Sequence, residues 1–205
     1  RGYANITSLW NTVDWPIVEL GDYCFEGCTS LKSLDGIPSG IVSIGSNVFA
    51  NCLSLADISA LKGMNLYDIP ESTFRNCRGL TGVSGLPSAL TNICQDAFAS
   101  CTALKSLDGI PDGVESIGDH AFSNCTSLVS VDALTNSLSY FGKGCFMGCT
   151  SLTNINSFSG NLYVLPEDAF RDCTALKNIE GLPTFSVIGD SCFSNCTSLV
   201  DCGIV

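Results

Sequence analysis

The chain has 205 residues, with 20 acidic residues against 9 lysines and arginines, and its formal net charge is -11. This charge excludes nucleic-acid binding through a basic surface as the default function. Hydrophobic residues make up 45% of the chain. They are dispersed along it, and no run approaches the roughly 20 residues that cross a bilayer. We therefore predict a folded chain without membrane insertion.

The N-terminal segment, 1–16, precedes the repeat region and is predicted to form an N-terminal cap or a partial repeat. Trp10 and Trp15 lie in this segment. A stacked repeat structure exposes its core at each end, and terminal segments have to cover it. We therefore expect the two tryptophans to cover the core rather than to hold a ligand.

Residues 17–199 contain a repeat whose marker is the motif F-x-x-C, found eight times at nearly constant spacing. Each Cys is followed three positions later by Leu, and an apolar residue, called the closing residue below, lies five positions before each Phe. Each unit is too short to bury its own apolar side, so neighbouring units must stack, which predicts a solenoid. The eight motifs are Phe25/Cys28, Phe49/Cys52, Phe74/Cys77, Phe98/Cys101, Phe122/Cys125, Phe146/Cys149, Phe170/Cys173 and Phe193/Cys196.

Three segments of each repeat have distinct predicted structures. The segment around Leu34 alternates in strand fashion, and its copies are predicted to form one long parallel sheet. After the closing residue comes Gly or Pro and often an acid, as at Gly118 and Asp119, which predicts a short helix or 3-10 turn whose dipole favours the acid. In six of the eight repeats Gly or Asn precedes the Cys, and these residues tolerate the left-handed conformation that ends a helix.

This repeat resembles the BspA-like, or Treponema pallidum type, leucine-rich repeat, with the pattern C-x-x-L-x-x-I-x-I-P-x-x-V-x-x-I-G-x-x-A-F-x-x-C. Residues 101–125, CTALKSLDGIPDGVESIGDHAFSNC, match it best. The resemblance implies an α/β, right-handed, horseshoe-like solenoid with one long parallel sheet and short helical or 3-10 turns, built from eight repeats of about 24 residues. The chain is then a single leucine-rich repeat domain, 1–205, in which 17–199 are the repeats and 200–205 are a truncated last repeat.

The residues offer no constellation for catalysis. His120 is the only histidine, and we expect it at an exposed position in the predicted helical turn. A single histidine excludes a multi-histidine metal site, and no phosphate-binding or dinucleotide-binding glycine motif follows a strand. We therefore predict no enzyme activity, no cofactor and no metal, and the resemblance likewise implies no catalytic residues.

The 13 cysteines are predicted to be structural thiols. Eight belong to the repeat column and never occur as paired C-x-x-C knuckles, so they are expected to form a ladder of small buried apolar side chains. Cys24, Cys145 and Cys192 precede a Phe where other repeats have Ala, which is again a small core position. Disulfides among some of the cysteines, or a metal site, are the alternatives.

The predicted partner-binding face consists of the exposed strand residues on either side of Leu34 and of the equivalent apolar residue in each repeat, six positions after the Cys and called the repeat leucine below. Acids and no bases line these columns. A solvated face without a binding role is the alternative, because binding hot spots are usually Trp, Tyr or Arg. The candidate residues are Ser33, Asp35, Asp57, Ser106, Asp108, Ser130, Asp132, Asn154, Asn156, Asn178 and Glu180.

Tyrosines define an alternative binding surface near the closing residues. Tyr67 and Tyr163 lie two positions before a closing residue, and Tyr140 lies one position before. With either surface, we predict a non-catalytic module that binds a protein, including a host or cell-surface protein, and no nucleic acid. The resemblance implies an extracellular or cell-surface adhesion or recognition protein. The alternative is an intracellular, cytoplasmic leucine-rich repeat scaffold, whose compartment would suit reduced cysteines.

Overall fold

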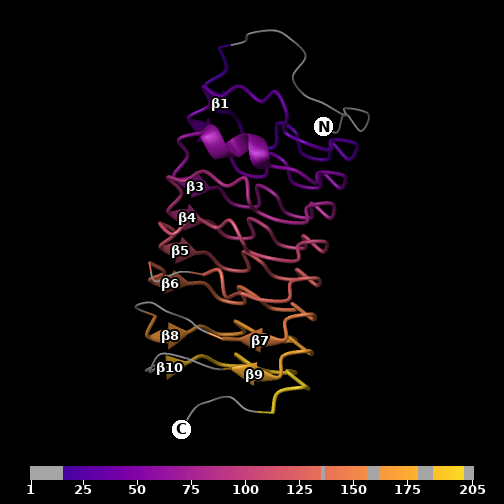
Figure 1. Cartoon of the computed structure of the whole chain (residues 1–205), viewed down its shortest axis with the longest axis vertical. Helices are drawn as coiled ribbons and strands as arrows, with labels where there is room; N and C mark the ends of the chain where they lie inside the picture. Colours follow the sequence, from indigo (N-terminus) through magenta and orange to yellow (C-terminus); the bar gives the residue numbers. More distant parts are fainter. Residues whose placement is uncertain (1–15, 135–136, 157–161, 180–186, 201–205) are drawn as a thin grey trace.

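The computed structural model describes residues 16–134, 137–156, 162–179 and 187–200, and the structural statements below concern these residues. Each repeat forms one turn of a solenoid, called a coil below. Figure 1 shows the coils stacked in sequence order, from indigo near the N-terminus to yellow near the C-terminus. The tryptophans of the predicted cap and residues 201–205 of the predicted last repeat lie outside the described residues.

Each coil contributes a two-residue strand that ends on the closing residue. The strands pair in parallel and in register, so that Ile93 is the partner of both Ile69 and Ile117. β1 pairs with β2, β3 to β6 form one four-stranded sheet, and β8 pairs with β10. These strands are β1 (Glu19–Leu20), β2 (Ser43–Ile44), β3 (Asp68–Ile69), β4 (Asn92–Ile93), β5 (Ser116–Ile117), β6 (Tyr140–Phe141), β8 (Val164–Leu165) and β10 (Val187–Ile188).

Proline interrupts this column of strands. Between paired coils, the residue after the closing residue donates its N–H to the previous closing residue, as Gly142 N does to Ile117 O at 2.8 Å. Pro70 and Pro166 occupy that position at the two places where β2 does not pair with β3 and β6 does not pair with β8. Proline has no N–H to donate, so the ladder loses a bond at both places.

The predicted strand around the repeat leucine exists only in parts. β7 (Asn154–Ile155) pairs in parallel with β9 (Asn178–Ile179), and Ser33 forms an isolated bridge with Asp57. The prediction of one long sheet at this position was wrong, because the longest sheet runs through the closing residues instead. A cause is visible at Asp108 and Asp132, whose amides donate to the hydroxyls of Ser106 and Ser130 at 3.0 Å. Such local bonds compete with a strand ladder.

The segment between the closing residue and the repeat Cys contains no helix, and of the two predicted alternatives, a short helix or a 3-10 turn, it forms turns with bonds from residue i to residue i−3, such as Ala99 N to Asp96 O at 3.0 Å. In one coil the amides of Asp96, Phe98 and Ser100 donate at 2.7 to 2.9 Å to carbonyls of the next coil. These donors therefore point along the stack, whereas helix donors bond within their own segment. A 3-10 helix, η1 (Ser59–Gly63), occurs elsewhere in the repeat.

Left-handed residues shape this turn. The residue before the repeat Cys has a φ between 57° and 74° at every F-x-x-C motif, so the sequence-based prediction for this column is confirmed. A second left-handed column contains His120, with a φ of 55°, and its members are mostly not glycine. The two left-handed residues in each coil rule out a continuous helix across the segment.

The acids after the closing residue act between coils rather than on a helix dipole. The carboxylate oxygen Oδ1 of Asp22 accepts the amide of Ser46 at 2.7 Å, and Oδ1 of Asp119 accepts the amide of Lys143 at 2.9 Å. Each bond joins one coil to the next. The predicted dipole role was therefore wrong, because the turn contains no helix.

The eight repeat phenylalanines form one stacked column through the core. Neighbouring ring centroids lie 5.3 to 5.8 Å apart, and their planes differ by 1° to 17°. The six rings from Phe49 to Phe170 are fully buried, whereas Phe25 and Phe193 at the ends of the column are half-buried. Stacked aromatic pairs contribute beyond the apolar area that they bury.

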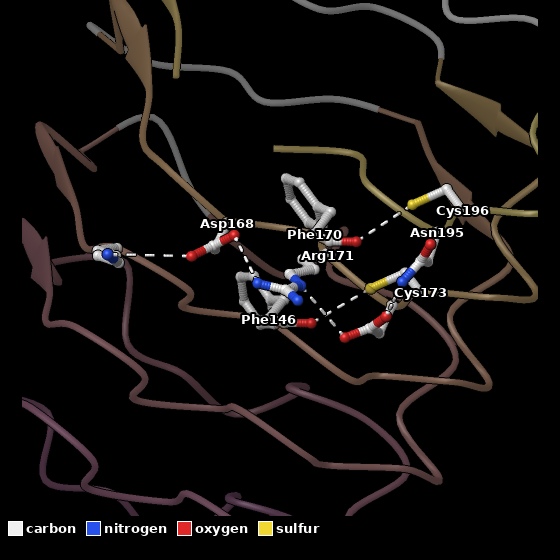
Figure 2. Close-up of polar contacts among 9 residues, drawn as sticks. Phe146, Asp168, Phe170, Arg171, Cys173, Asn195 and Cys196 are labelled. Carbon is white, nitrogen blue, oxygen red and sulfur yellow. Dashed lines mark hydrogen bonds and ion pairs between the residues drawn. The ribbon is translucent and has the colours of Figure 1, made fainter. Parts of the chain in front are cut away.

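The repeat cysteines form a buried ladder beside the phenylalanines, as predicted, but their thiols are also hydrogen-bond donors. Cys101 Sγ donates to Phe74 O at 3.1 Å, and Cys125 Sγ donates to Phe98 O at 3.3 Å. The same carbonyl oxygen of Phe74 also accepts the amide of Cys77 at 3.1 Å, so the thiol of Cys101 bonds to the second lone pair of that oxygen. Figure 2 shows two such bonds, from Cys173 to Phe146 and from Cys196 to Phe170.

Burial keeps these thiols protonated. It raises the pKa of Cys101 to about 12 and that of Cys125 well above its usual range. Cys145 and Cys192 are buried too, as predicted, but Cys24 is exposed, so its predicted core position was wrong. Buried thiols of high pKa are poor nucleophiles, which fits structural rather than reactive cysteines.

Close approach of the coils makes Gly118 sensitive to substitution. A Cβ added there would lie 2.6 Å from Gln95 N and 2.8 Å from Cys94 C, both backbone atoms of the preceding coil. We expect Gly118→Ala to lower the free energy of unfolding by about 1 to 3 kcal/mol, as overpacking does. Gly113→Ala is the control, because its nearest atom, Leu90 O, would lie at 3.5 Å. Urea unfolding should separate the two variants, and equal stabilities would contradict the close approach.

Candidate functional site

The predicted acidic face is present, but much of its hydrogen-bonding capacity is used within the face. Ser33 Oγ donates to Asp35 Oδ2 at 2.7 Å, and both oxygens of Asp132 accept bonds from Asn156, at 3.2 and 2.8 Å. Glu180 lies outside the described residues. The half-buried candidates are Ser33, Ser106, Ser130, Asn154 and Asn178, and the exposed ones are Asp35, Asp57, Asp108, Asp132 and Asn156.

A shallow hollow interrupts this face beside Asp57. It has a volume of about 330 Å³ and is lined by small residues that include Gly82, Ser84 and Gly85. Gly82 belongs to the same column as Ser106, so its missing side chain contributes to the hollow. No aromatic residue is among the lining residues, and the face therefore lacks the large anchors that dominate most protein interfaces.

The alternative aromatic surface contains a larger groove. Tyr140 and Tyr163 line it, with exposed fractions of 53% and 64%, and its volume is about 580 Å³. Tyr67 is also exposed, but Thr91, Glu115 and Ser139 separate it from Tyr163 along their column, and it does not line the groove. The structure thus brings together two of the three predicted tyrosines.

The groove lies where the strand column is interrupted. Apart from Asp119, which follows β5, its lining residues come from the segments around β6 and β8, which are not paired and which are drawn apart in Figure 1. Pro166, which replaces the amide donor at this step, is itself a lining residue. The groove therefore lies at one of the two steps where proline interrupts the strand column.

Charged side chains complete the groove. Tyr140 donates its hydroxyl to Asp119 Oδ1 at 3.5 Å, and Lys143 Nζ lies 2.8 Å from Glu167 Oε1. Lys143 Nζ also lies 3.9 Å from Asp168, which contacts Arg171 at 3.5 Å (Figure 2). The lining residues thus include two acids and one base.

Tyr140 and Lys143, two of the titratable residues that line the groove, keep their protons at neutral pH. Burial and the neighbouring carboxylate of Asp119 raise the pKa of Tyr140. The hydrogen bond to Glu167 raises the pKa of Lys143. The groove therefore presents a neutral phenol, an ammonium group paired with a carboxylate, and the carboxylate of Asp119.

Sequence reasoning found the tyrosines but missed the charged residues beside them. A signal was present, because Asp119, Lys143 and Glu167 follow one another at the repeat period and so occupy one column in three successive coils. Alternating charges at the repeat period indicate ion pairs along the stack. Only the Lys143–Glu167 pair has an ion-pair distance among these three described residues.

His120 has a structural position instead of the predicted exposed one. It is half-buried, and its ring packs over Gly144 of the next coil, where an added Cβ would lie 2.5 Å from His120 Nδ1. The left-handed backbone at His120 turns the side chain along the stack. In the described part of the chain, no group of three or more His, Cys, Asp or Glu residues is arranged to hold a metal ion.

These features define the class of protein. Short parallel strands in register and stacked columns of apolar side chains, repeated at a short and regular period, make a leucine-rich repeat solenoid. The family model for the BspA type leucine rich repeat region matches residues 3–109 and 68–200, with 6 copies. The chain therefore belongs to the BspA-type leucine-rich repeat family.

Solved structures agree with this assignment. A leucine-rich repeat protein of T. pallidum is 29% identical, with a TM-score of 0.63, over 94% of this chain and 77% of that one. A leucine-rich repeat protein of Bacteroides ovatus is 25% identical, with a TM-score of 0.63, over 90% of this chain and 57% of that one. No curated protein sequence matches the chain.

The family has a typical general function. Leucine-rich repeat proteins of this kind are typically non-catalytic modules that bind other proteins, and the BspA type is often surface-associated in bacteria. Among the described residues, no helix has the length and hydropathy that a membrane span requires.

Proposed function

We propose that the chain is the recognition module of a cell-surface or secreted adhesion protein, and that it binds a protein partner through the groove of Tyr140 and Tyr163. The observation that carries the proposal is the pair of half-exposed tyrosines over a groove of about 580 Å³. Tyrosine is enriched among the residues that dominate binding energies, and concave sites bury more of a partner's surface.

The acidic face is the second candidate. Asp108 and Asp132 are exposed there, and a row of acids attracts basic partners over about 10 Å at 0.1 M salt. Such charges mainly raise association rates and contribute less to final affinity. We therefore assign this face, including Asp35, Asp57 and Glu180, a steering role for partners that bind elsewhere.

The buried cysteine ladder is compatible with a surface location. Its thiols are shielded from oxidants in either compartment, because Cys77, Cys101 and Cys125 are fully buried. The reduced thiols are the one feature that supports the competing function, an intracellular scaffold. The family's association with bacterial surfaces supports the extracellular assignment. We further propose a right-handed, horseshoe-like stack of eight coils, which the eight-membered phenylalanine column supports.

A peptide display library tests the binding surface. Random 12-residue peptides are selected against the chain, and their affinities are then measured against Tyr140→Ala/Tyr163→Ala and against Tyr67→Ala. We expect the double variant to weaken binding at least about tenfold, because truncation of a hot-spot aromatic removes a large share of the contact energy. Tyr67→Ala should bind normally, since Tyr67 lies outside the groove.

The same peptides distinguish the two surfaces. If Asp108→Asn/Asp132→Asn weakens binding at equilibrium and the tyrosine variant does not, the acidic face is the recognition site. Melting temperatures of all variants are compared first, because the exposed positions should leave folding nearly unchanged.

A further inference from the structure

We propose that the Tyr140–Tyr163 groove recognises an arginine side chain carried by an extended segment of a partner protein. This inference rests on the proposed function and specifies the chemistry of the partner. In the bound state, the guanidinium group lies at Asp119 beside the Tyr140 ring, and the aliphatic part of the side chain packs against Tyr163.

The charge of the groove selects a cation. Lys143 is engaged with Glu167 at 2.8 Å and is also 3.9 Å from Asp168, so its positive charge is already balanced. Asp119 makes no ion pair with a base among the described residues. Glu115, in the same column as Ser139 and Tyr163, adds a further exposed carboxylate nearby. The field in the groove is therefore negative, as is the field of the whole chain.

Asp119 retains capacity to accept hydrogen bonds. Its bonds from Lys143 N at 2.9 Å and from the Tyr140 hydroxyl at 3.5 Å both end on Oδ1. A carboxylate offers about four acceptor sites on two oxygens, so a guanidinium group can bind without displacing the backbone bond. The bond from Lys143 N also fixes the carboxylate in place before a partner arrives.

Arginine fits this combination better than other side chains. Its planar guanidinium stacks on tyrosine rings and donates through a fork, whereas the ammonium group of lysine is a strongly hydrated point charge. An apolar side chain would desolvate Asp119 and the Lys143–Glu167 pair without compensating them. An anionic ligand such as nucleic acid would be repelled, and a neutral sugar would gain nothing from the charge.

The interrupted strand column argues for an extended segment. β6 and β8 flank the groove and do not pair with each other, so the groove runs between two strand edges. An extended peptide placed along such edges can present one side chain into the groove and continue over the exposed side chain of Val164.

Three short peptides test the inference by NMR: Ac-Gly-Arg-Gly-NH₂, the lysine analogue and the uncharged citrulline analogue. We expect the arginine peptide to shift the ring resonances of Tyr140 and Tyr163 and to bind at least about five-fold more tightly than the citrulline peptide, because citrulline keeps the shape and loses the charge. The lysine peptide should fall between the two.

Protein variants locate the effect. Asp119→Asn keeps an oxygen acceptor for Lys143 N and should abolish the preference for arginine over citrulline. Glu71→Gln is the matched control, because Glu71 occupies the same column two coils earlier and is exposed outside the groove. It should leave the preference unchanged.

The outcomes separate this inference from the proposed function. Equal binding of the arginine and citrulline peptides, or ring resonances that no peptide shifts, overturns the arginine inference, and the groove remains the binding site if the display peptides still require both tyrosines. If those peptides bind the tyrosine variant normally, the proposed groove function fails as well. Neutral glycans that bind only with both tyrosines present, without any preference for arginine, would also overturn the inference.

Discussion

Raising the pH from 7.5 to 9.5 is expected to remove most of the stability of the chain. An unfolded cysteine loses its proton near pH 8.5. Burial raises the pKa of Cys52 and Cys101 to about 12, and that of Cys77 further above its usual range. Between these values the unfolded chain releases protons that the folded chain retains, so stability is complete below about pH 8.5 and falls as the pH rises.

The expected loss is large because the thiols act together. At pH 9.5, about one unit above the unfolded pKa, each buried thiol has lowered the free energy of unfolding by about 1.4 kcal/mol. The ladder thiols from Cys52 to Cys173 are fully buried and number six. At pH 9.5 they lower the free energy of unfolding by about 8 kcal/mol, which is comparable to the entire stability of a typical domain, about 5 to 15 kcal/mol.

Urea unfolding at pH 7.5, 8.5, 9.0 and 9.5 measures this effect, under argon and with reductant so that thiolates do not oxidise. The control is Cys101→Ser/Cys125→Ser, in which the hydroxyls can still donate to the phenylalanine carbonyls but do not titrate. Its stability should fall less steeply than that of the wild type, so that at pH 9.5 it has lost about 3 kcal/mol less. Parallel curves for the two proteins would show that the ladder does not cause alkaline unfolding.

The sequence determines the columns of the solenoid because each column has one chemical requirement. Buried positions along the stack need apolar or small side chains at a fixed period, so Phe, Cys and Leu columns predict which side chains meet. The left-handed position before the repeat Cys was predictable for a similar reason, since Gly and Asn tolerate it. At Ser100 and Asp172 the same conformation occurs without that signal.

The position of the longest sheet could not be predicted in the same way. Both the repeat leucine and the closing residue are buried apolar positions flanked by exposed ones, so their local patterns are alike. The outcome depends on whether an amide bonds to the neighbouring coil or locally, and the amide of Asp108 bonds locally to the hydroxyl of Ser106. Of the two predicted alternatives for the following segment, the helix does not form, because Gly or Pro followed by an acid also begins a turn in which the carboxylate accepts an amide of the next coil.

The groove depends on a relation among three coils that no single repeat reveals. Tyr140 and Tyr163 come from different columns, and both line the groove at the step where Pro166 interrupts the pairing of β6 with β8. The tyrosines could be proposed from their columns alone. The position of Asp119 at their side follows from the stacking of successive coils, which the repeat period implies but does not measure.

Truncation of a central phenylalanine is expected to destabilise the chain by about 3 to 5 kcal/mol, as for other buried phenylalanines. Phe98 is fully buried, and its ring stacks at 5.3 Å on both Phe74 and Phe122. Phe98→Ala leaves a cavity that the two neighbouring rings cannot fill without leaving their own positions. Phe25 and Phe193 are half-buried, so the same substitution removes less apolar area from the core at either end.

Urea unfolding of Phe98→Ala, Phe122→Ala, Phe25→Ala and Phe193→Ala measures this gradient, with amide hydrogen exchange to locate where each variant opens. Phe98→Leu is the matched control, because it keeps an apolar side chain at the same position and should lose clearly less stability than Phe98→Ala. In a stack of coils each unit contacts only its neighbours, so the two central alanine variants should share the larger loss. Equal losses at the centre and at the ends would mean that the phenylalanine column does not transmit stability between coils.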